Sequence, residues 1–179
     1  MKKVIAAIYL SLDGVMEEPS WTMPYWSEEL GQMQHNLLFA CDSLLLGRVT
    51  YQGFAAAWPT MKDEDGFADR INSLPKFVAS TTLDTMEWNA QPLHGDVAEA
   101  VTHLKQEPGQ DILIYGSGEL VRFLMQHDLI DEYRLMVHPV VLGSGKRLFE
   151  TGSQAPLKLL NTQTTSTGVV VLTYQPDRK

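Results

Sequence analysis

Two glycine-bearing turns hold the residues whose types and spacing best suit chemistry. The first reads Leu46-Gly47-Arg48-Val49-Thr50, and the second reads Tyr115-Gly116-Ser117-Gly118-Glu119. Each turn follows a short apolar run typical of a strand and precedes a helical pattern, so it directs backbone N–H groups and the positive end of a helix toward one place. Such an arrangement binds phosphate, and both turns are candidate sites for a phosphate-bearing cofactor.

For either turn alone, a second interpretation stays open. Glycine after a strand often serves only close packing, and for an isolated turn we favour this interpretation. Arg48 changes this balance, because a guanidinium beside helix-start N–H groups suits bidentate contact with phosphate. Its alternative is a surface ion pair with Asp63 or Glu64. A Rossmann fingerprint is excluded, since Val121 stands where a third glycine is required.

Asp13 is the candidate catalytic acid. It follows the apolar run Val4–Leu10, at a strand exit where a side chain can face a ligand. An Asp-Gly pair is equally typical of a plain turn. Glu28 and Glu29 follow the N-cap residue Ser27, and their interaction with the helix dipole explains them without a catalytic role.

The pattern of apolar residues predicts the elements that must position these groups. Short apolar runs predict strands at residues 4–10, 43–46, 76–79 and 111–115, and amphipathic spacing predicts helices at 28–40, 49–57, 97–107 and after 118. Three further strand-like segments follow at 132–142, 157–165 and 169–174. The pattern therefore predicts one α/β domain whose mixed sheet has helices on both faces and an antiparallel C-terminal part.

Length and composition limit the possible functions. The 179 residues fit a single domain, 1–179, without a linker or repeat. Cys41 is the only cysteine, and no histidine spacing suits zinc, so neither a disulfide nor a metal site is expected. A net charge of −8 disfavours nucleic-acid binding. The first apolar run is too short for a signal sequence or a membrane span, so a cytoplasmic location without membrane contact is expected.

Four segments, taken in order and with their spacing, resemble the dihydrofolate reductase superfamily: Ser11-Leu12-Asp13-Gly14, Leu45-Leu46-Gly47-Arg48-Val49-Thr50-Tyr51, Phe77-Val78-Ala79-Ser80-Thr81 and Ile112-Leu113-Ile114-Tyr115-Gly116-Ser117-Gly118-Glu119-Leu120. The Leu12-Asp13-Gly14 step and the tail His138-Pro139-Val140-Val141-Leu142-Gly143 are more similar to the C-terminal reductase domain of the riboflavin-biosynthesis deaminase/reductase. The resemblance spans nearly the whole chain. It implies a three-layer α/β/α fold with a mixed sheet of about eight strands.

The resemblance also implies a cofactor, NADPH. In such relatives the first glycine turn and the Ser-Thr pair after the third strand hold its phosphates and ribose, which here assigns Gly47, Arg48, Thr50, Ser80 and Thr81. The second turn would meet the pyrophosphate through Gly116, Ser117, Gly118, Glu119 and Leu120. Without the resemblance, Ser80 and Thr81 are equally well explained as turn residues that cap a strand. A cis peptide bond between Gly116 and Ser117 is typical of these relatives and is expected here.

By the same resemblance, the expected activity is NADPH-dependent reduction of a small heterocycle or ribosylaminopyrimidine, similar to 5-amino-6-(5-phosphoribosylamino)uracil reductase. Folate reductases carry a carboxylate on the first helix where this chain has Leu30-Gly31-Gln32, so turnover of dihydrofolate is not expected. Nothing resembles the zinc deaminase half of the riboflavin enzyme. The alternative is a protein that binds a nucleotide or another ligand without catalysis.

Two further expectations concern packing. The irregular loop at residues 16–26 carries Trp21, Tyr25 and Trp26, which either stack on a bound ring or pack as core. The apolar segment 137–142 is expected near a sheet edge that a second copy covers, which gives a homodimer. The alternative is a monomer that buries this segment in its own core.

Overall fold

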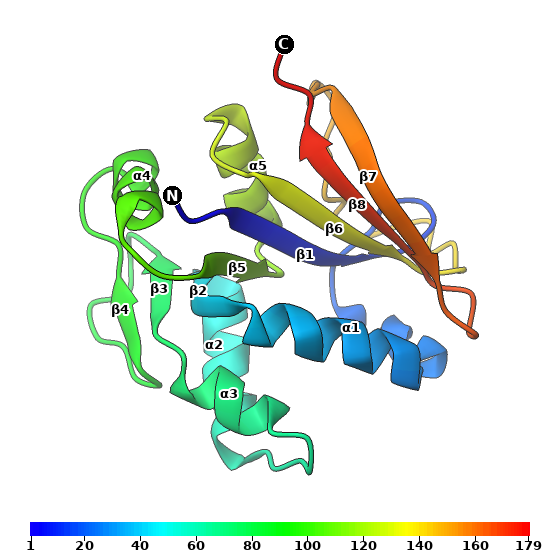
Figure 1. Ribbon diagram of the computed structural model, residues 1–179, viewed down its shortest axis with the longest axis horizontal. Helices are drawn as coiled ribbons and strands as arrows, with labels where there is room; N and C mark the ends of the chain where they lie inside the picture. The colour runs from blue at the N-terminus through cyan, green and yellow to red at the C-terminus, as the bar shows by residue number, and fades with distance from the viewer.

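One eight-stranded sheet runs through the computed structural model, which describes residues 1–179 (Figure 1). Its order is β4-β3-β2-β5-β1-β6-β8-β7. The strands from β4 to β6 in this order run parallel, and β8 pairs antiparallel with both β6 and β7. The prediction of a mixed sheet with an antiparallel C-terminal part is therefore confirmed. The strands are β1 Val4–Leu10, β2 Cys41–Gly47, β3 Lys76–Ala79, β4 Ala90–Pro92, β5 Asp111–Tyr115, β6 Glu132–Val137, β7 Leu157–Thr164 and β8 Val170–Pro176.

Helices cover both faces of this sheet and complete three layers (Figure 1). One face packs against α1 Glu28–Phe39, α2 Arg48–Ala57 and α3 Phe67–Ser73; the other packs against α4 Val97–Gln106 and α5 Gly118–Gln126. Two short 3₁₀ helices, η1 Pro19–Tyr25 and η2 Trp58–Thr60, lie in loops. Burial on both faces explains why the parallel strands read as continuous apolar runs rather than alternating ones.

Local capping sets two of the helix starts that the sequence predicts. The Ser27 hydroxyl accepts a hydrogen bond from the Leu30 N–H at 3.2 Å and begins α1. The Asp96 carboxylate accepts one from the Glu99 N–H at 3.0 Å and begins α4. Both side chains satisfy an N–H group that lacks a partner in the first helical turn.

The prediction that segment 137–142 lies near a sheet edge is wrong. Strand β6 ends at Val137 and lies between β1 and β8, while the edges of the sheet are β4 and β7. Only Val137 of this segment belongs to the strand; the residues after it form a loop in which His138 is fully buried and Val141 is exposed. At the actual edge, β7 is exposed along most of its length, with Leu159 and Leu160 about half exposed.

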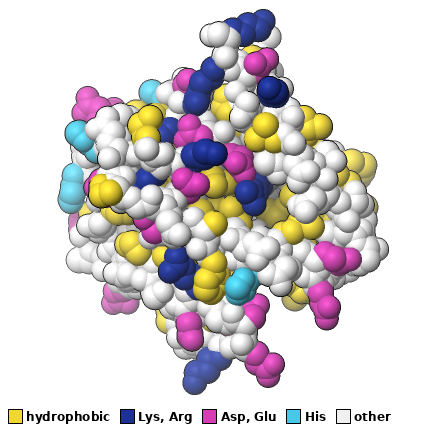
Figure 2. Space-filling model, in the orientation of Figure 1, with side chains coloured by type: hydrophobic (Ala, Val, Ile, Leu, Met, Phe, Trp, Pro, Cys, Tyr) yellow, Lys and Arg dark blue, Asp and Glu magenta, His cyan; other side chains and the backbone are white.

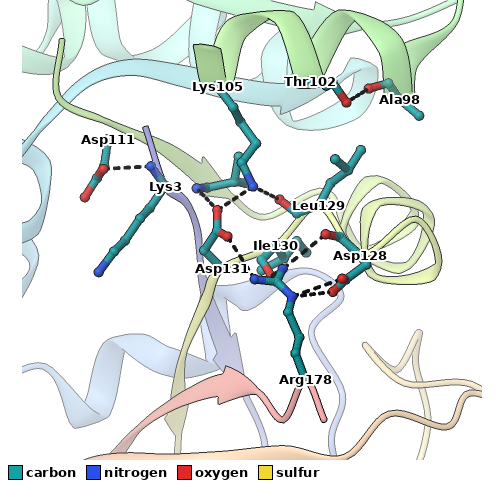
Figure 3. A network of polar contacts seen from close by, with 11 residues as sticks. Lys3, Ala98, Thr102, Lys105, Asp111, Asp128, Leu129, Ile130, Asp131 and Arg178 are labelled. Atoms are coloured by element: carbon teal, nitrogen blue, oxygen red, sulfur yellow. Dashed lines mark hydrogen bonds and ion pairs between the residues drawn. The ribbon is translucent and has the colours of Figure 1, made fainter. Parts of the chain in front are cut away.

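An ion-pair network fixes the beginning of the central strand β1, at the end of the sheet opposite the glycine turns (Figure 3). The Asp131 carboxylate accepts a hydrogen bond from the Val4 N–H at 2.9 Å and lies 2.7 Å from Lys105 Nζ on α4. Arg178, near the C-terminus, lies 3.4 Å from Asp131 and 2.9 Å from Asp128. The Lys105 and Asp131 side chains are largely buried, so the network joins β1, α4 and the chain end tightly.

The surface carries charges of both signs. On the face shown in Figure 2, basic and acidic side chains lie interspersed among polar and apolar ones, without a continuous stripe of either sign. None of the helices combines the length and the apolar character that crossing a lipid bilayer requires.

Candidate functional site

The fold brings both glycine turns to one end of the sheet, where the carboxyl ends of the parallel strands lie. Strands β2 and β5 are parallel neighbours, with Leu45 of β2 beside Ile114 of β5, and each turn follows the carboxyl end of its strand. The helices that begin there, α2 and α5, cover opposite faces of the sheet, so their N-termini flank the same pair of strand ends. In open α/β sheets, ligands bind outside the carboxyl ends of the strands.

Hydrogen bonds join the two turns directly. The Gly47 N–H donates to Ser117 Oγ at 2.6 Å. In return, the Ser117 N–H and hydroxyl both donate to Thr50 Oγ1, at 3.1 and 3.0 Å. Ser117 thus lies at the centre of a junction between segments 70 residues apart. The spacing of the sequence did not predict this junction.

Close approach explains the glycines at this junction. A Cβ on Gly47 would lie 3.0 Å from Ser117 Oγ, and a Cβ on Gly116 would lie 2.9 Å from Thr50 Oγ1. A Cβ on Gly118 would lie 2.5 Å from the sulfur of Met16, in the loop after β1. The packing interpretation of these glycines therefore holds, and it is compatible with binding a phosphate above them.

The expected cis peptide bond between Gly116 and Ser117 does not occur, because every peptide bond of the chain is trans. The turn is made instead by two consecutive residues in the left-handed region, since Gly116 and Ser117 both have φ of +58°. Glycine adopts this region without cost, whereas serine does not. The Ser117 hydroxyl bonds described above offset that cost.

Backbone donors and one arginine are available beside the junction. Neither Gly47 nor Ser117 provides a side-chain cap, and the first N–H groups of α2 and α5 take part in no capping, turn or loop hydrogen bond. The exposed Arg48 guanidinium contacts Gln52 Oε1 at 3.3 Å, and no carboxylate lies within ion-pair distance of it. The ion pair of Arg48 with Asp63 or Glu64 is therefore absent.

Ser80 and Thr81 lie at the same end of the sheet as the glycine turns, one strand further from β5. They follow β3, whose Ala79 pairs with Gly47 of β2. Ser80 Oγ accepts hydrogen bonds from the N–H groups of Thr82 and Leu83, both at 3.2 Å. Ser80 thus serves its own turn, as the capping interpretation predicts, while Thr81 is exposed.

Asp13 anchors the loop after β1. Its carboxylate accepts hydrogen bonds from the Ser11 hydroxyl at 2.6 Å, the Gly143 N–H at 2.8 Å and the Leu142 N–H at 3.2 Å. Arg147 Nη2 lies 3.8 Å away. These contacts, that of Ser11 first, lower the pKa of Asp13 to about 2. The side chain is therefore ionised near neutral pH and holds no proton that it could donate.

Four polar side chains that the sequence analysis did not select as site residues lie on the α1 face of the sheet, near the carboxyl ends of the parallel strands. They come from β1, α1, β5 and the residue after β6, and we refer to Tyr9, Gln34, Tyr115 and His138 as the Tyr9 cluster. The Gln34 amide donates to the Tyr9 hydroxyl at 2.9 Å. The Tyr115 hydroxyl and His138 Nε2 are buried and make no hydrogen bond. One signal was present in the sequence, because Gln34 interrupts the apolar face of α1.

Aromatic residues of η1 cover this cluster. Trp21 and Tyr25 meet the His138 ring edge-on, with centroids 5.3 and 5.9 Å away, and Tyr9 meets it at 5.5 Å. Trp26 is 57 % exposed and lies outside the group. In the structure, Trp21 and Tyr25 thus pack against the cluster, although η1 contributes no fully buried residue.

Sequence comparison identifies relatives of the whole chain. The family model of the RibD C-terminal domain matches residues 2–171. The uncharacterized protein YyaP of Bacillus subtilis (strain 168) is 31 % identical over 177 residues, which cover 97 % of this chain and 94 % of YyaP.

Solved structures share the fold at low sequence identity. A putative riboflavin biosynthesis protein from Shewanella sp. PV-4 aligns with a TM-score of 0.78 at 22 % identity, covering 98 % of this chain and 99 % of that one. Dihydrofolate reductase from Enterococcus faecalis, complexed with NADP(H), aligns with a TM-score of 0.67 at 13 % identity, covering 98 % and 97 %. The resemblance drawn from the motifs is thus confirmed, and this chain belongs to the RibD C-terminal domain family.

Proposed function

We propose that this protein is an NADPH-dependent reductase of a small heterocyclic or ribosylaminopyrimidine substrate, similar to 5-amino-6-(5-phosphoribosylamino)uracil reductase. The observation that carries the proposal is the junction of the two glycine turns. It places the N-termini of α2 and α5 beside an arginine that has no acidic partner. Membership of a family with a reductase-type fold supports the same reading.

The residues at and beside the two glycine turns fit the charged half of NADPH. Unbonded helix-start N–H groups and a guanidinium without a carboxylate are groups that phosphates satisfy. We assign the pyrophosphate to residues 116–120 and to Gly47 and Thr50, and the 2′-phosphate to Arg48 with Ser80 and Thr81. When bound, NADPH supplies the hydride. The protein residues bind and orient it.

Asp13, expected from the sequence as the acid, is proposed here as a positioning residue. Its carboxylate fixes the loop after β1 to residues 142 and 143, and this loop brings Met16 against Gly118 at the start of α5. An ionised Asp13 therefore acts on the site through the shape of the loop rather than by proton transfer.

One observation favours the second candidate function, binding without catalysis. The first helix presents no carboxylate to the sheet: its buried polar residue is Gln34, and Glu29 instead accepts hydrogen bonds from the Ser166 N–H and hydroxyl at 3.3 and 3.2 Å. A protein of this second kind binds NADPH but does not oxidise it with any pteridine or pyrimidine.

A fluorescence titration tests the cofactor assignment. Arg48→Ala removes the only charge that we assign to the 2′-phosphate, so we expect NADPH to bind about tenfold more weakly while NADH changes little. Lys158→Ala, which removes an exposed cation on β7, is the control and leaves both titrations unchanged. Equal losses for the two nucleotides would exclude Arg48 from the 2′-phosphate site. Steady NADPH oxidation with an added pteridine or pyrimidine then separates the reductase from the binding protein.

We further propose a cytoplasmic homodimer. The supporting feature is β7, an eight-residue edge strand with seven exposed residues, Leu159 and Leu160 among them. Such an edge offers unpaired backbone groups and apolar side chains, and a second copy can cover both.

A further inference from the structure

Tyr51 joins α2 to a distant part of the chain through its hydroxyl. It lies three positions after Arg48 and is 6 % exposed. The hydroxyl accepts a hydrogen bond from the Glu87 N–H at 2.8 Å and donates one to the Glu87 carbonyl oxygen at 3.2 Å. A phenylalanine ring would fill the same space in the core, so packing alone does not require a hydroxyl here. The hydroxyl instead specifies where residue 87 lies relative to α2.

This contact closes a loop that leaves β3 and returns to α2. Ala79, the last residue of β3, pairs with Gly47 at the end of β2. Residues 80–86, which we call the 80–86 loop, follow and end at Glu87. The two bonds of Tyr51 are the only hydrogen bonds between α2 and the segment that runs from this loop through Glu87. The loop is therefore attached at one end to β2 and at the other end to α2.

The groups that we assign to the 2′-phosphate lie on both sides of this closed path. Arg48 lies between the two attachment points on the side of β2 and α2, whereas Ser80 and Thr81 lie on the side of the 80–86 loop. Donors that already converge bind a phosphate more tightly, because ordering them during binding costs affinity. The Tyr51 hydroxyl fixes the second attachment point, so it helps to hold these donors at one spacing before a nucleotide arrives.

The two residues after this attachment point are strained and firmly held. Trp88 and Asn89 both adopt the left-handed backbone region, with φ of +60° and +53°. Trp88 Nε1 donates to Asn72 Oδ1 at 2.6 Å, and the Asn89 side-chain amide donates to the Ser73 carbonyl oxygen at 2.9 Å. Such strain persists only where the surrounding structure over-determines the backbone, and it is concentrated at functional sites. Contacts with both α2 and α3 thus place the far end of the 80–86 loop.

We propose that Tyr51 is a positioning residue that sets the distance between Arg48 and the Ser80–Thr81 pair. Through this distance it determines the preference for a nucleotide with a 2′-phosphate over one with a 2′-hydroxyl. The inference rests on the proposed cofactor site. Because the buried Tyr51 hydroxyl is already bonded to Glu87, it acts through the phosphate-binding groups and not by contact with the nucleotide.

Titration calorimetry with 2′,5′-ADP and 5′-AMP measures this preference, because the two nucleotides differ only in the 2′-phosphate. We expect the wild-type protein to bind 2′,5′-ADP at least about tenfold more tightly. Tyr51→Phe should reduce this ratio to about threefold or less, with 5′-AMP binding changed by less than about twofold. Tyr133→Phe, the same change at a buried tyrosine on β6, should leave both affinities unchanged. A merely structural role for Tyr51 would leave the ratio of the two affinities unchanged.

A double-mutant cycle tests whether Tyr51 acts through Arg48. In the Arg48→Ala background, Tyr51→Phe should weaken 2′,5′-ADP by less than about twofold, because the charge that it helps to position is gone. Hydrogen exchange at the Glu87 amide tests the contact without any nucleotide, and it should be faster in Tyr51→Phe and unchanged in Tyr133→Phe. If Tyr51→Phe does not fold, Glu87→Gly loosens the same contact from the loop side and should lower the ratio in the same direction.

The outcomes distinguish this inference from the cofactor assignment. Loss of the preference together with faster exchange at Glu87 supports the positioning role. A wild-type preference for 2′,5′-ADP that Tyr51→Phe retains overturns that role and leaves the 2′-phosphate site standing. Equal effects of Tyr51→Phe with and without Arg48 overturn it as well. A wild-type protein that binds the two nucleotides equally, or binds neither, overturns both the positioning role and the 2′-phosphate site.

Discussion

Ser117 is the residue whose replacement best tests the junction between the glycine turns. Its hydroxyl accepts the Gly47 N–H at 2.6 Å and donates to Thr50 Oγ1 at 3.0 Å, while its backbone is held at φ of +58°. The two features affect the free energy of unfolding in opposite directions. The hydrogen bonds raise it, whereas the left-handed backbone lowers it for any residue with a Cβ. Alanine and glycine replacements separate them.

The expected changes in the free energy of unfolding follow from the lost hydrogen bonds and from the backbone strain. Ser117→Ala keeps the Cβ and leaves the half-buried Gly47 N–H without its partner, which should lower the free energy of unfolding by about 2 kcal/mol. Ser117→Gly loses the same bonds but relieves the left-handed backbone, a gain of about 1 kcal/mol. The expected order of stability is therefore wild type, then the glycine variant, then the alanine variant.

Urea unfolding at equal m-values measures this order. Ser73→Ala is the control: its hydroxyl bonds only the Arg70 carbonyl on the exposed end of α3, so its removal should change the free energy of unfolding by less than about 0.5 kcal/mol. An alanine variant as stable as the glycine variant would refute the backbone argument. Two variants as stable as the wild type would refute the contribution of the hydroxyl.

Three other predictions concern stability and assembly. Asp131→Ala should lower the free energy of unfolding by about 3 kcal/mol, because it leaves Lys105 buried without its partner; Asp128→Ala, at a side chain that is 64 % exposed, should cost less than about 1 kcal/mol, and equal urea-unfolding losses would contradict this. The pKa of Asp13, about 2, lies below its unfolded value, so its contribution is present above about pH 4 and is lost as pH falls toward 2; Asp13→Asn should flatten this acid limb in unfolding measured against pH. Light scattering should give twice the chain mass of 20.1 kDa, and Leu160→Lys on β7 should return it to one chain, whereas a wild-type mass of 20.1 kDa would exclude the dimer.

The sequence predicted those elements whose signals are local. Strands β3 and β5 have the predicted bounds, and Ser27 and Asp96 begin their helices, because apolar runs and capping residues act within a few positions. The seven-residue α3 and the three-residue β4 were missed, since segments this short carry almost no periodicity. The segment 132–142 was predicted too long because Pro139, which has no N–H group for a ladder, follows the end of β6.

The candidate site was predicted in part for the same reason. Glycine, arginine and threonine beside a helix start are a local pattern, so both turns could be located in the sequence. The bond between Gly47 and Ser117 joins residues 70 positions apart and depends on β5 pairing with β2, an order of strands that no local pattern encodes. The same holds for the bonds that make Asp13 an ionised anchor, since Gly143 lies 130 positions away.

The glycine turns and the Tyr9 cluster differ in charge. At the glycine turns, helix-start N–H groups and Arg48 present positive charge, which suits the phosphates of a dinucleotide. On the α1 face, the Tyr9 cluster is polar but neutral, with the pKa values of Tyr115 and His138 shifted toward their uncharged forms. Since Asp13 is ionised as well, none of these residues is a strong acid near neutral pH. We therefore expect the proton that accompanies the proposed hydride transfer to come from solvent.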